Sequence, residues 1–192
     1  MLLHIKSMKK IILASQSPRR KELLGLLDIE FTVEVREIDE VYPETIEAKD
    51  VAEYLAKLKS EAFIDLNEDE LVITADTVVI IDEQILGKPK NKIEASQMLQ
   101  NLSNRSHKVM TGVCIKSKDK TLSFSDTTHV FFKELSSSEI EYYIENYQPF
   151  DKAGSYGIQE WIGAVGITKI EGSYFNVVGL PIQKLSRYLS EV

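Results

Sequence analysis

Two long extended runs in the second half of the chain constrain its fold most. Residues 107–117 and 121–132 are rich in apolar, β-branched and aromatic side chains, and the charged turn Lys118-Asp119-Lys120 joins them. Two such runs separated by a short polar turn are typical of an antiparallel hairpin. The sequence therefore predicts a pair of long antiparallel strands, to which the elements of the first half must be added.

The first half of the chain alternates apolar strands with amphipathic helices. We expect strands over 9–15, 31–35 and 71–75, a short hairpin over 78–86 that turns near Asp82-Glu83, and helices over 18–27, 48–64 and 92–102. Later segments predict a helix capped by Ser136 or Ser137 and ending near Tyr147, an extended stretch over 163–170, and a last helix after Gly179-Leu180-Pro181. This order favours an α/β fold, with a mixed central sheet and helices on its faces.

The chain shows no internal repeat, no low-complexity tract and no linker rich in Pro, Gly or Ser. A single domain over 9–192 is therefore the simplest interpretation. Residues 1–8 form an N-terminal extension whose order the sequence leaves open.

Charge and cysteine content narrow the range of partners. The chain has 23 Lys and Arg against 30 Asp and Glu, a formal charge of −7. This acid excess disfavours a long nucleic acid polymer, but it is compatible with a small phosphate ligand held by local cations. No apolar run approaches the ~20 residues that cross a bilayer. The single cysteine, Cys114, cannot form an internal disulfide, so we expect a cytoplasmic protein without a membrane partner.

The first predicted strand leads into a turn with an unusual charge pattern. Ser17 is a suitable helix N-cap, with Pro18 at the first helical position. A helix N-terminus attracts anions, because its first amides are unpaired and the helix dipole is positive there. Arg19 and Arg20 oppose that dipole at ~0.3–1 kcal/mol each, beside the hydroxyls of Ser15 and Ser17. The pattern favours a phosphate site, and a solvated helix start is the alternative.

Acidic residues supply a second candidate group. Asp76 follows the apolar run 71–75 and is expected to end that strand. Ligands of α/β proteins bind at the carboxyl ends of strands, where a carboxylate leaving apolar surroundings has to be paired or metal-bound. With Asp39 or Glu40, Asp76 could supply the oxygen ligands of a hard divalent cation. The alternatives, a turn residue at Asp76 helped by Thr77 and a solvated acidic loop at 39–40, stay open.

Six segments in order resemble the Maf family of nucleotide pyrophosphatases, historically called septum formation inhibitors. They are ILASQSPRRKELL at 12–24, ADTVV at 75–79, GKPK at 87–90, HKVMTGV at 107–113, DKAGSYGIQ at 151–159 and GSYFNVVGLP at 172–181. The resemblance extends from about Lys9 to the C-terminus. It implies a mixed-sheet α/β fold related to the inosine-triphosphate pyrophosphatases, a homodimer, and metal-dependent hydrolysis of a nucleoside triphosphate to the monophosphate and pyrophosphate.

The resemblance also implies roles for individual residues. Ser15, Arg19 and Arg20 match the phosphate-binding start of the family motif. Asp76 and Glu40 match its acidic positions, although either acid of the pair at 39–40 could be the matching one. In the resulting hypothesis these two carboxylates hold Mg²⁺ or Mn²⁺, and one of them orients the attacking water. Whether Asp76 is a general base or only a metal ligand is left open.

Three further positions follow from the same resemblance. Lys59, at the border of the apolar stripe of the 48–64 helix, matches a substrate-contacting position. Lys88 and Gln159 match substrate-contacting positions as well. We expect Lys88 to contact the phosphates and to take part in catalysis, and Gln159 could recognise the base. Thr77 after Asp76 resembles the sequence of the family branch that acts on dTTP and UTP. The branch that acts on methylated guanine nucleotides has glutamine at this position.

Two other functions compete with this hypothesis. A nucleotidyltransferase also opens with a strand, a turn and a basic helix, but its turn is rich in glycine, and residues 15–18 contain none. A nucleotide-binding regulator of septum formation without essential catalysis, as the older family name suggests, stays an alternative.

Overall fold

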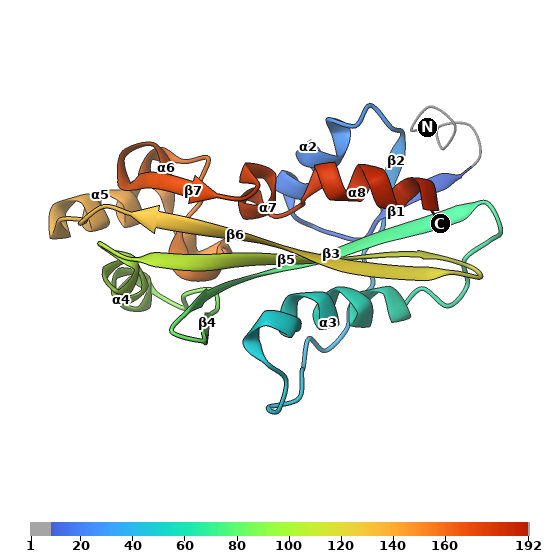
Figure 1. Ribbon diagram of the computed structural model, residues 1–192, viewed down its shortest axis with the longest axis horizontal. Helices are drawn as coiled ribbons and strands as arrows, with labels where there is room; N and C mark the ends of the chain where they lie inside the picture. Colours follow the sequence, from blue (N-terminus) through green and yellow to red (C-terminus); the bar gives the residue numbers. More distant parts are fainter. Residues whose placement is uncertain (1–8, 192) are drawn as a thin grey trace. The chain divides into compact units, whose positions relative to one another are not determined.

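The computed structural model describes residues 9–191 (Figure 1). The expected extension over 1–8 lies outside the described residues. The described chain falls into two compact units: unit 1 comprises 9–76, Thr111–Asp126 and 179–191, and unit 2 comprises Thr77–Met110 and Thr127–Val178. Strands β3, β5 and β6 contribute residues to both. The single domain over 9–192 stays a prediction.

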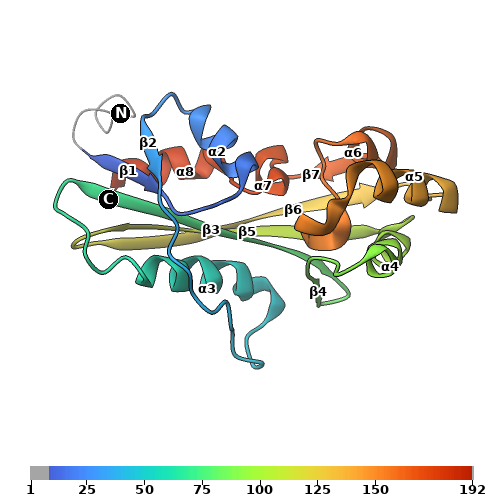
Figure 2. The same cartoon turned by 180° about the vertical axis from the view of Figure 1, so that it is seen from behind.

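Unit 1 places helices on both faces of its strands. Its elements are β1 (Lys10–Leu13), α2 (Pro18–Gly25), β2 (Phe31–Val33), α3 (Ala48–Glu61), α8 (Ile182–Tyr188), η3 (Leu189–Glu191) and parts of β3 (Glu70–Ile81), β5 (Ser106–Ser117) and β6 (Thr121–Phe132). In Figures 1 and 2, α3 covers one face of these strands, and α2 and α8 cover the other. The core beneath the end of α3 includes Phe63, packed with Ile12 and Val72.

Unit 2 contains the remaining helices. They are α4 (Lys92–Leu102), α5 (Ser137–Tyr147), the short 3₁₀ turns η1 (Pro149–Asp151) and η2 (Ala153–Ser155), α6 (Trp161–Gly166) and α7 (Tyr174–Val178), with strands β4 (Gln84–Leu86) and β7 (Ile167–Glu171). Helix α5 begins with a capping box between Ser136 and Glu139, which settles the choice of N-cap. Fully buried Tyr143, Leu99 and Ile162 lie in the core of this unit.

The strands form a mixed sheet in the order β2-β1-β3-β5-β6-β7, with β4 paired to β3. Strand β1 runs parallel to both β2 and β3, so that Ile12 lies opposite Thr32 and Val72. The pairings of β4 with β3 and of β7 with β6 are antiparallel. The mixed sheet and the long hairpin of β5 and β6 agree with expectation. The hairpin closes where the Ser117 amide donates to the Lys120 carbonyl at 2.8 Å.

Two sequence expectations are wrong. Asp76 does not end a strand, because β3 continues from Glu70 to Ile81. The buried run 78–81 keeps the chain extended, and the polar pair at 76–77 only interrupts the apolar pattern. The stretch 163–170 is not extended throughout, since its first four residues belong to α6. Gly163 permits this turn, because a Cβ there would lie 1.9 Å from the Ile158 carbonyl oxygen.

Candidate functional site

The first helix of unit 1 begins at the turn that the sequence singles out. Ser17 is its N-cap, Pro18 its first residue, and the first turn contains no acidic side chain. The Ser17 hydroxyl accepts from the Arg20 amide at 3.5 Å, and the buried Ser15 hydroxyl accepts from the Ser17 amide at 3.2 Å. The start of α2 is therefore a positive helix end lined by hydroxyls, a combination that suits an anion.

Arg20 is oriented from two sides. Its Nε donates to the Gly179 carbonyl at 2.9 Å, and its Nη1 lies 3.4 Å from the Ser15 hydroxyl. Burial lowers the pKa of the guanidinium, while the charges of Asp76 and Glu40 oppose that shift. Arginine nevertheless stays protonated in proteins. A fixed positive charge thus lies within electrostatic reach of two carboxylates.

Those two carboxylates share one ammonium group. Lys59 Nζ lies 2.6 Å from Asp76 Oδ1 and 3.1 Å from Glu40 Oε2. The Lys59 and Asp76 side chains are 17% and 14% exposed, whereas Glu40 is 52% exposed. Asp39 is exposed, and its carbonyl accepts from the Val41 amide. The structure thus pairs Glu40 with Lys59.

Close packing of α3 against the sheet positions Lys59. A Cβ on Gly112 of β5 would lie 2.3 Å from backbone atoms of Ala52, so only glycine allows the helix and strand to approach this closely. The buried Thr74 hydroxyl donates to the Ala56 carbonyl at 2.6 Å. These contacts hold α3 one turn before Lys59, so that its ammonium reaches the strand residue Asp76.

The donor set fits a divalent cation that retains water and substrate ligands. Within residues 9–191, no group of three or more His, Cys, Asp and Glu side chains is arranged to hold a metal. Asp76 and Glu40 nevertheless both lie within 3.1 Å of one atom, the Lys59 Nζ. Mg²⁺ is commonly bound by one or two carboxylates plus substrate phosphates. The two acids therefore fit Mg²⁺ or Mn²⁺ completed by a ligand.

The other candidate residues divide between the two units. Arg19, partly buried in the first turn of α2, belongs to unit 1 with the residues above. Thr77, Lys88 and Gln159 belong to unit 2. Lys88 is exposed beside Gly87, and Gln159 is exposed in a turn closed by a 3.0 Å bond between Glu160 and Gly157.

Sequence reasoning missed two glycines that shape the site. Gly112 lies in an apolar strand, where an isolated glycine indicates a close backbone approach. Gly179 has a φ of 126°, a conformation that favours glycine, and presents its carbonyl to Arg20. Both positions belong to segments that resemble the family, but only the fold shows which residues approach them.

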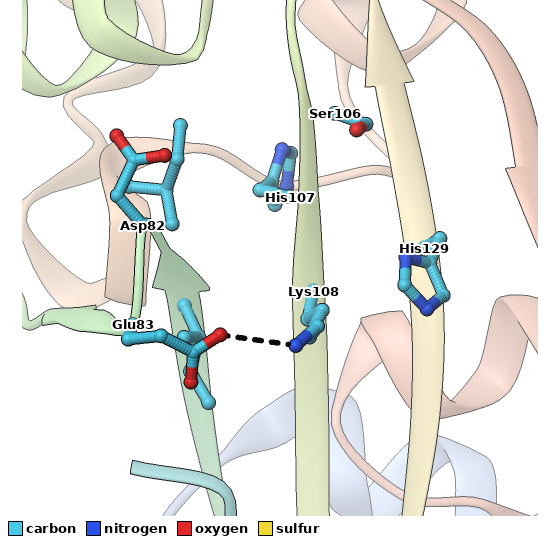
Figure 3. Close-up of a pocket in the computed structure, with 8 residues that line it drawn as sticks. Asp82, Glu83, Ser106, His107, Lys108 and His129 are labelled. Carbon is cyan, nitrogen blue, oxygen red and sulfur yellow. Dashed lines mark hydrogen bonds and ion pairs between the residues drawn. The ribbon is translucent and has the colours of Figure 1, made fainter.

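Unit 2 contains a pocket of about 160 Å³ (Figure 3). It is lined by Ile80, Ile81, Asp82, Glu83, Ser106, His107, Lys108 and His129. Glu83 pairs with Lys108 at 3.3 Å, and both Asp82 oxygens accept from Arg105 at 2.6 Å. Burial lowers the pKa of His107 to about 4, so this ring is neutral at pH 7. The pocket contains none of the candidate residues, and its acids are already paired with basic side chains.

Comparison with known proteins gives a consistent result. A family model described as Maf-like protein matches residues 10–192. The dTTP/UTP pyrophosphatase of Flavobacterium psychrophilum is 55% identical, over 94% of this chain and 93% of that protein. The proteins of the same name from Parabacteroides distasonis and Christiangramia forsetii are 51% and 48% identical, each over at least 94% of both chains.

A solved structure shows the same fold. The HAM1 protein from Coxiella burnetii aligns with a TM-score of 0.52 at 17% identity, over 96% of this chain and 100% of that chain. This likeness and the strand order confirm the expected mixed-sheet α/β fold. Among residues 9–191, no helix is both long and apolar enough to span a bilayer.

Proposed function

The chain belongs to the Maf family, and we infer that it is a nucleoside triphosphate pyrophosphatase that hydrolyses dTTP and UTP to the monophosphate and pyrophosphate. Relatives about 50% identical over nearly the whole chain are named for this activity. The observation in the structure that carries the inference is the convergence in unit 1 of Arg20, Lys59, Asp76 and Glu40. Cations beside a pair of carboxylates are what a magnesium-loaded triphosphate requires.

We propose that the α2 turn binds the phosphates. Ser15 and Ser17 supply hydroxyls, the helix N-terminus supplies backbone amides, and Arg19 and Arg20 supply positive charge. Arg20 is pre-oriented by Gly179 and Ser15, so less side-chain freedom is lost when an anion binds. This arrangement favours the transition state because negative charge grows on the departing pyrophosphate.

Asp76 and Glu40 are proposed to hold Mg²⁺ or Mn²⁺ in the nucleotide complex. The metal would supply Lewis-acid stabilisation of phosphate oxygen charge. The Asp76 carboxylate is proposed to orient a water toward the α-phosphorus and to accept its proton. The bond from the α-phosphorus to the oxygen bridging to the β-phosphorus then breaks, and pyrophosphate leaves. Lys59, adjacent to both acids, offsets their charge as the polyanion approaches.

The roles of the unit 2 residues are proposed from family resemblance alone. Lys88 is assigned to the phosphates and catalysis, Thr77 to substrate binding, and Gln159 to the pyrimidine edge. Comparing UTP with CTP in wild type and Gln159→Ala tests the last role, because loss of a reading side chain should lower the UTP/CTP ratio of kcat/KM. An unchanged ratio would remove Gln159 from base selection.

A cytoplasmic homodimer is proposed as the working state, without a nucleic acid or membrane partner. The buried lone thiol of Cys114 is compatible with a reducing compartment. Exposed apolar side chains of unit 1 are compatible with a second copy as partner, namely Val33, Val35, Val41 and Tyr42. Light scattering coupled to gel filtration distinguishes a dimer from a monomer.

A nucleotide panel with Mg²⁺ or Mn²⁺ tests the proposed function. Pyrophosphate and orthophosphate are measured separately for dTTP, UTP, CTP, ATP and GTP, with chelator as the metal control. We expect pyrophosphate and the monophosphate from dTTP and UTP, and no release with chelator. Orthophosphate as the first product would contradict cleavage between the α and β phosphates. Nucleotide binding without any release would favour the regulator.

A further inference from the structure

The segment that carries Glu40 has few attachments of its own. Residues 34–47 connect β2 to α3 without a helix or strand. The Glu34 amide donates to the Leu13 carbonyl of β1 at 3.2 Å, but the backbone hydrogen bonds described beyond it are local, from Val41 to Asp39 at 2.8 Å and from Ile46 to Pro43 at 3.1 Å. Glu40 contacts Lys59 through a half-exposed ion pair. A single pair of this kind contributes little against the entropy of ordering the segment, so another contact has to fix its course.

Arg36 supplies that contact. Its Nη1 donates to the Ala62 carbonyl at 2.9 Å and to Asp65 Oδ1 at 2.5 Å, and its Nε donates to Glu34 Oε1 at 2.9 Å. The guanidinium also lies 4.3 Å from the centre of the Phe63 ring. Phe63 is 1% exposed and belongs to the unit 1 core. Arg36 therefore fastens an irregular segment to a rigid part of the fold.

The two attachment points lie close together on α3. Ala62 is the C-cap of this helix, and Lys59 precedes it by three residues, so both lie on one side of its last turn. On the connecting segment, Glu40 follows Arg36 by four residues. Fixing Arg36 at the helix end therefore restricts where the chain can place Glu40. The approach of Glu40 to Lys59 and Asp76 depends on this restriction.

We propose that Arg36 is a positioning residue for the active site, acting through Glu40. Its planar guanidinium joins a backbone carbonyl, two carboxylates and an aromatic face at once, which the point charge of lysine cannot do. The inference rests on the proposed function, and it assigns to Arg36 the task of holding one of the two acids in place. Arg36 itself touches neither acid of the proposed metal site in the contacts described, so it is not proposed as a catalytic residue.

A double-mutant cycle tests this proposal. Glu40→Gln is expected to lower kcat/KM for dTTP about 10- to 100-fold, in the range seen when metal ligation is disturbed, and Arg36→Met about 10-fold. If Arg36 acts through Glu40, the double variant should be no worse than Glu40→Gln alone. Arg36→Lys keeps the charge but not the planar guanidinium, so its kcat/KM should fall several-fold. It serves as the second variant if Arg36→Met does not fold.

Amide exchange provides a readout that does not depend on activity. Arg36→Met should accelerate exchange over residues 37–47 and leave the protected amides of α3 unchanged. Arg105→Met is the matched control, because the Arg105 guanidinium also binds a carboxylate, that of Asp82, at a site with no candidate residue. It should keep kcat/KM within about twofold, as expected for an exposed pair.

Three outcomes would overturn the proposal. One is that Arg36→Met lowers kcat/KM by the same factor in the wild-type and Glu40→Gln backgrounds. Another is unchanged kcat/KM in Arg36→Met while Glu40→Gln is impaired, and the third is unchanged exchange over 37–47. A wild-type protein that releases no pyrophosphate would instead contradict the proposed function, so the two failures are distinguishable.

Discussion

Each unit contains a lysine that bridges two carboxylates, yet the two clusters differ in their surroundings. Lys59 in unit 1 lies 2.6 and 3.1 Å from its acids, and Lys152 in unit 2 lies 2.6 Å from Asp151 and 3.0 Å from Glu160. Around the second lysine the protein supplies further partners. The buried Tyr143 hydroxyl donates to Glu160 and accepts from the Gly157 amide at 3.0 Å.

Nearly equal distances thus accompany different surroundings. The Lys152 side chain is 9% exposed, and its partner Glu160 also accepts from the buried Tyr143 hydroxyl, which is typical of a structural ion pair. Both clusters contain an exposed acid, Glu40 at 52% and Asp151 at 60%, but only the Lys59 cluster lies beside the arginine-rich turn of α2. The charged groups of the Lys59 cluster can therefore bind a ligand. The distance between two charges therefore does not identify a functional site. The other groups that contact the charged side chains do.

The largest expected effect separates the acids of the two clusters. Asp76→Asn should lower kcat by about 10³-fold or more, because it removes the charge that orients water and metal in the transition state. Steady-state kinetics with dTTP measures this, and thermal unfolding checks that the fold persists. Asp151→Asn is the matched control and should stay within about twofold. Similar losses in both variants would abolish the distinction.

Stability should show the opposite order. Lys152→Met removes a buried ammonium and leaves the partly buried Glu160 without its cation, and breaking such a pair costs about 3–4 kcal/mol of unfolding free energy. Lys59→Met should cost less than half as much, because Arg20 already lies close enough to Asp76 to offset its charge. Urea denaturation measures both values. An equal cost would mean that the unit 1 cluster is structural as well.

Acid should weaken the protein through unit 2. Burial holds the pKa of His107 near 4, against 6.5 for an ordinary histidine. Between these values the unfolded chain binds the extra proton, so stability is complete above pH 6.5 and is lost as pH falls toward 4. The loss is about 3 kcal/mol. His107→Phe should flatten this part of the urea-midpoint profile, and an unchanged slope would exclude His107 as its source.

The smallest expected effect concerns one hydroxyl group. Burial and the neighbouring Glu160 raise the pKa of Tyr143, so its hydroxyl stays protonated and donates. Tyr143→Phe removes that donor and leaves the Gly157 amide without its acceptor, at a cost of about 1–2 kcal/mol. Calorimetry measures the shift. Tyr142→Phe, on the exposed side of α5, is the control and should have no effect.

Local signals predicted much of the fold. The Ser17 cap, the capping box at Ser136 and the long hairpin are visible in the sequence because each depends on residues a few positions apart. The strand predicted from the sequence before Asp76 is too short, because a polar pair inside a buried run has the same local pattern as a strand end. Its continuation depends on pairing with β4 and β5, which local sequence does not show.

The candidate site was predictable in its residue types but not in its geometry. The basic turn and Asp76 follow from charge and position, while the contact from Lys59 to Asp76 joins residues 17 apart. No pattern in the sequence predicts the role of Arg36, because its partners Ala62 and Asp65 lie 26 and 29 residues away. Long-range contacts of this kind arise from the packing of α3 on the sheet, which no short motif records.

The contact from Arg20 to the carbonyl of Gly179 has a consequence for synthesis. These residues are 159 positions apart, so the turn at Arg20 is completed by a segment that is synthesised much later. A nascent chain that stops before Gly179 would contain every charged residue assigned to the phosphates and metal, yet its arginine would lack this acceptor. Nucleotide hydrolysis should therefore begin only once translation has passed Gly179.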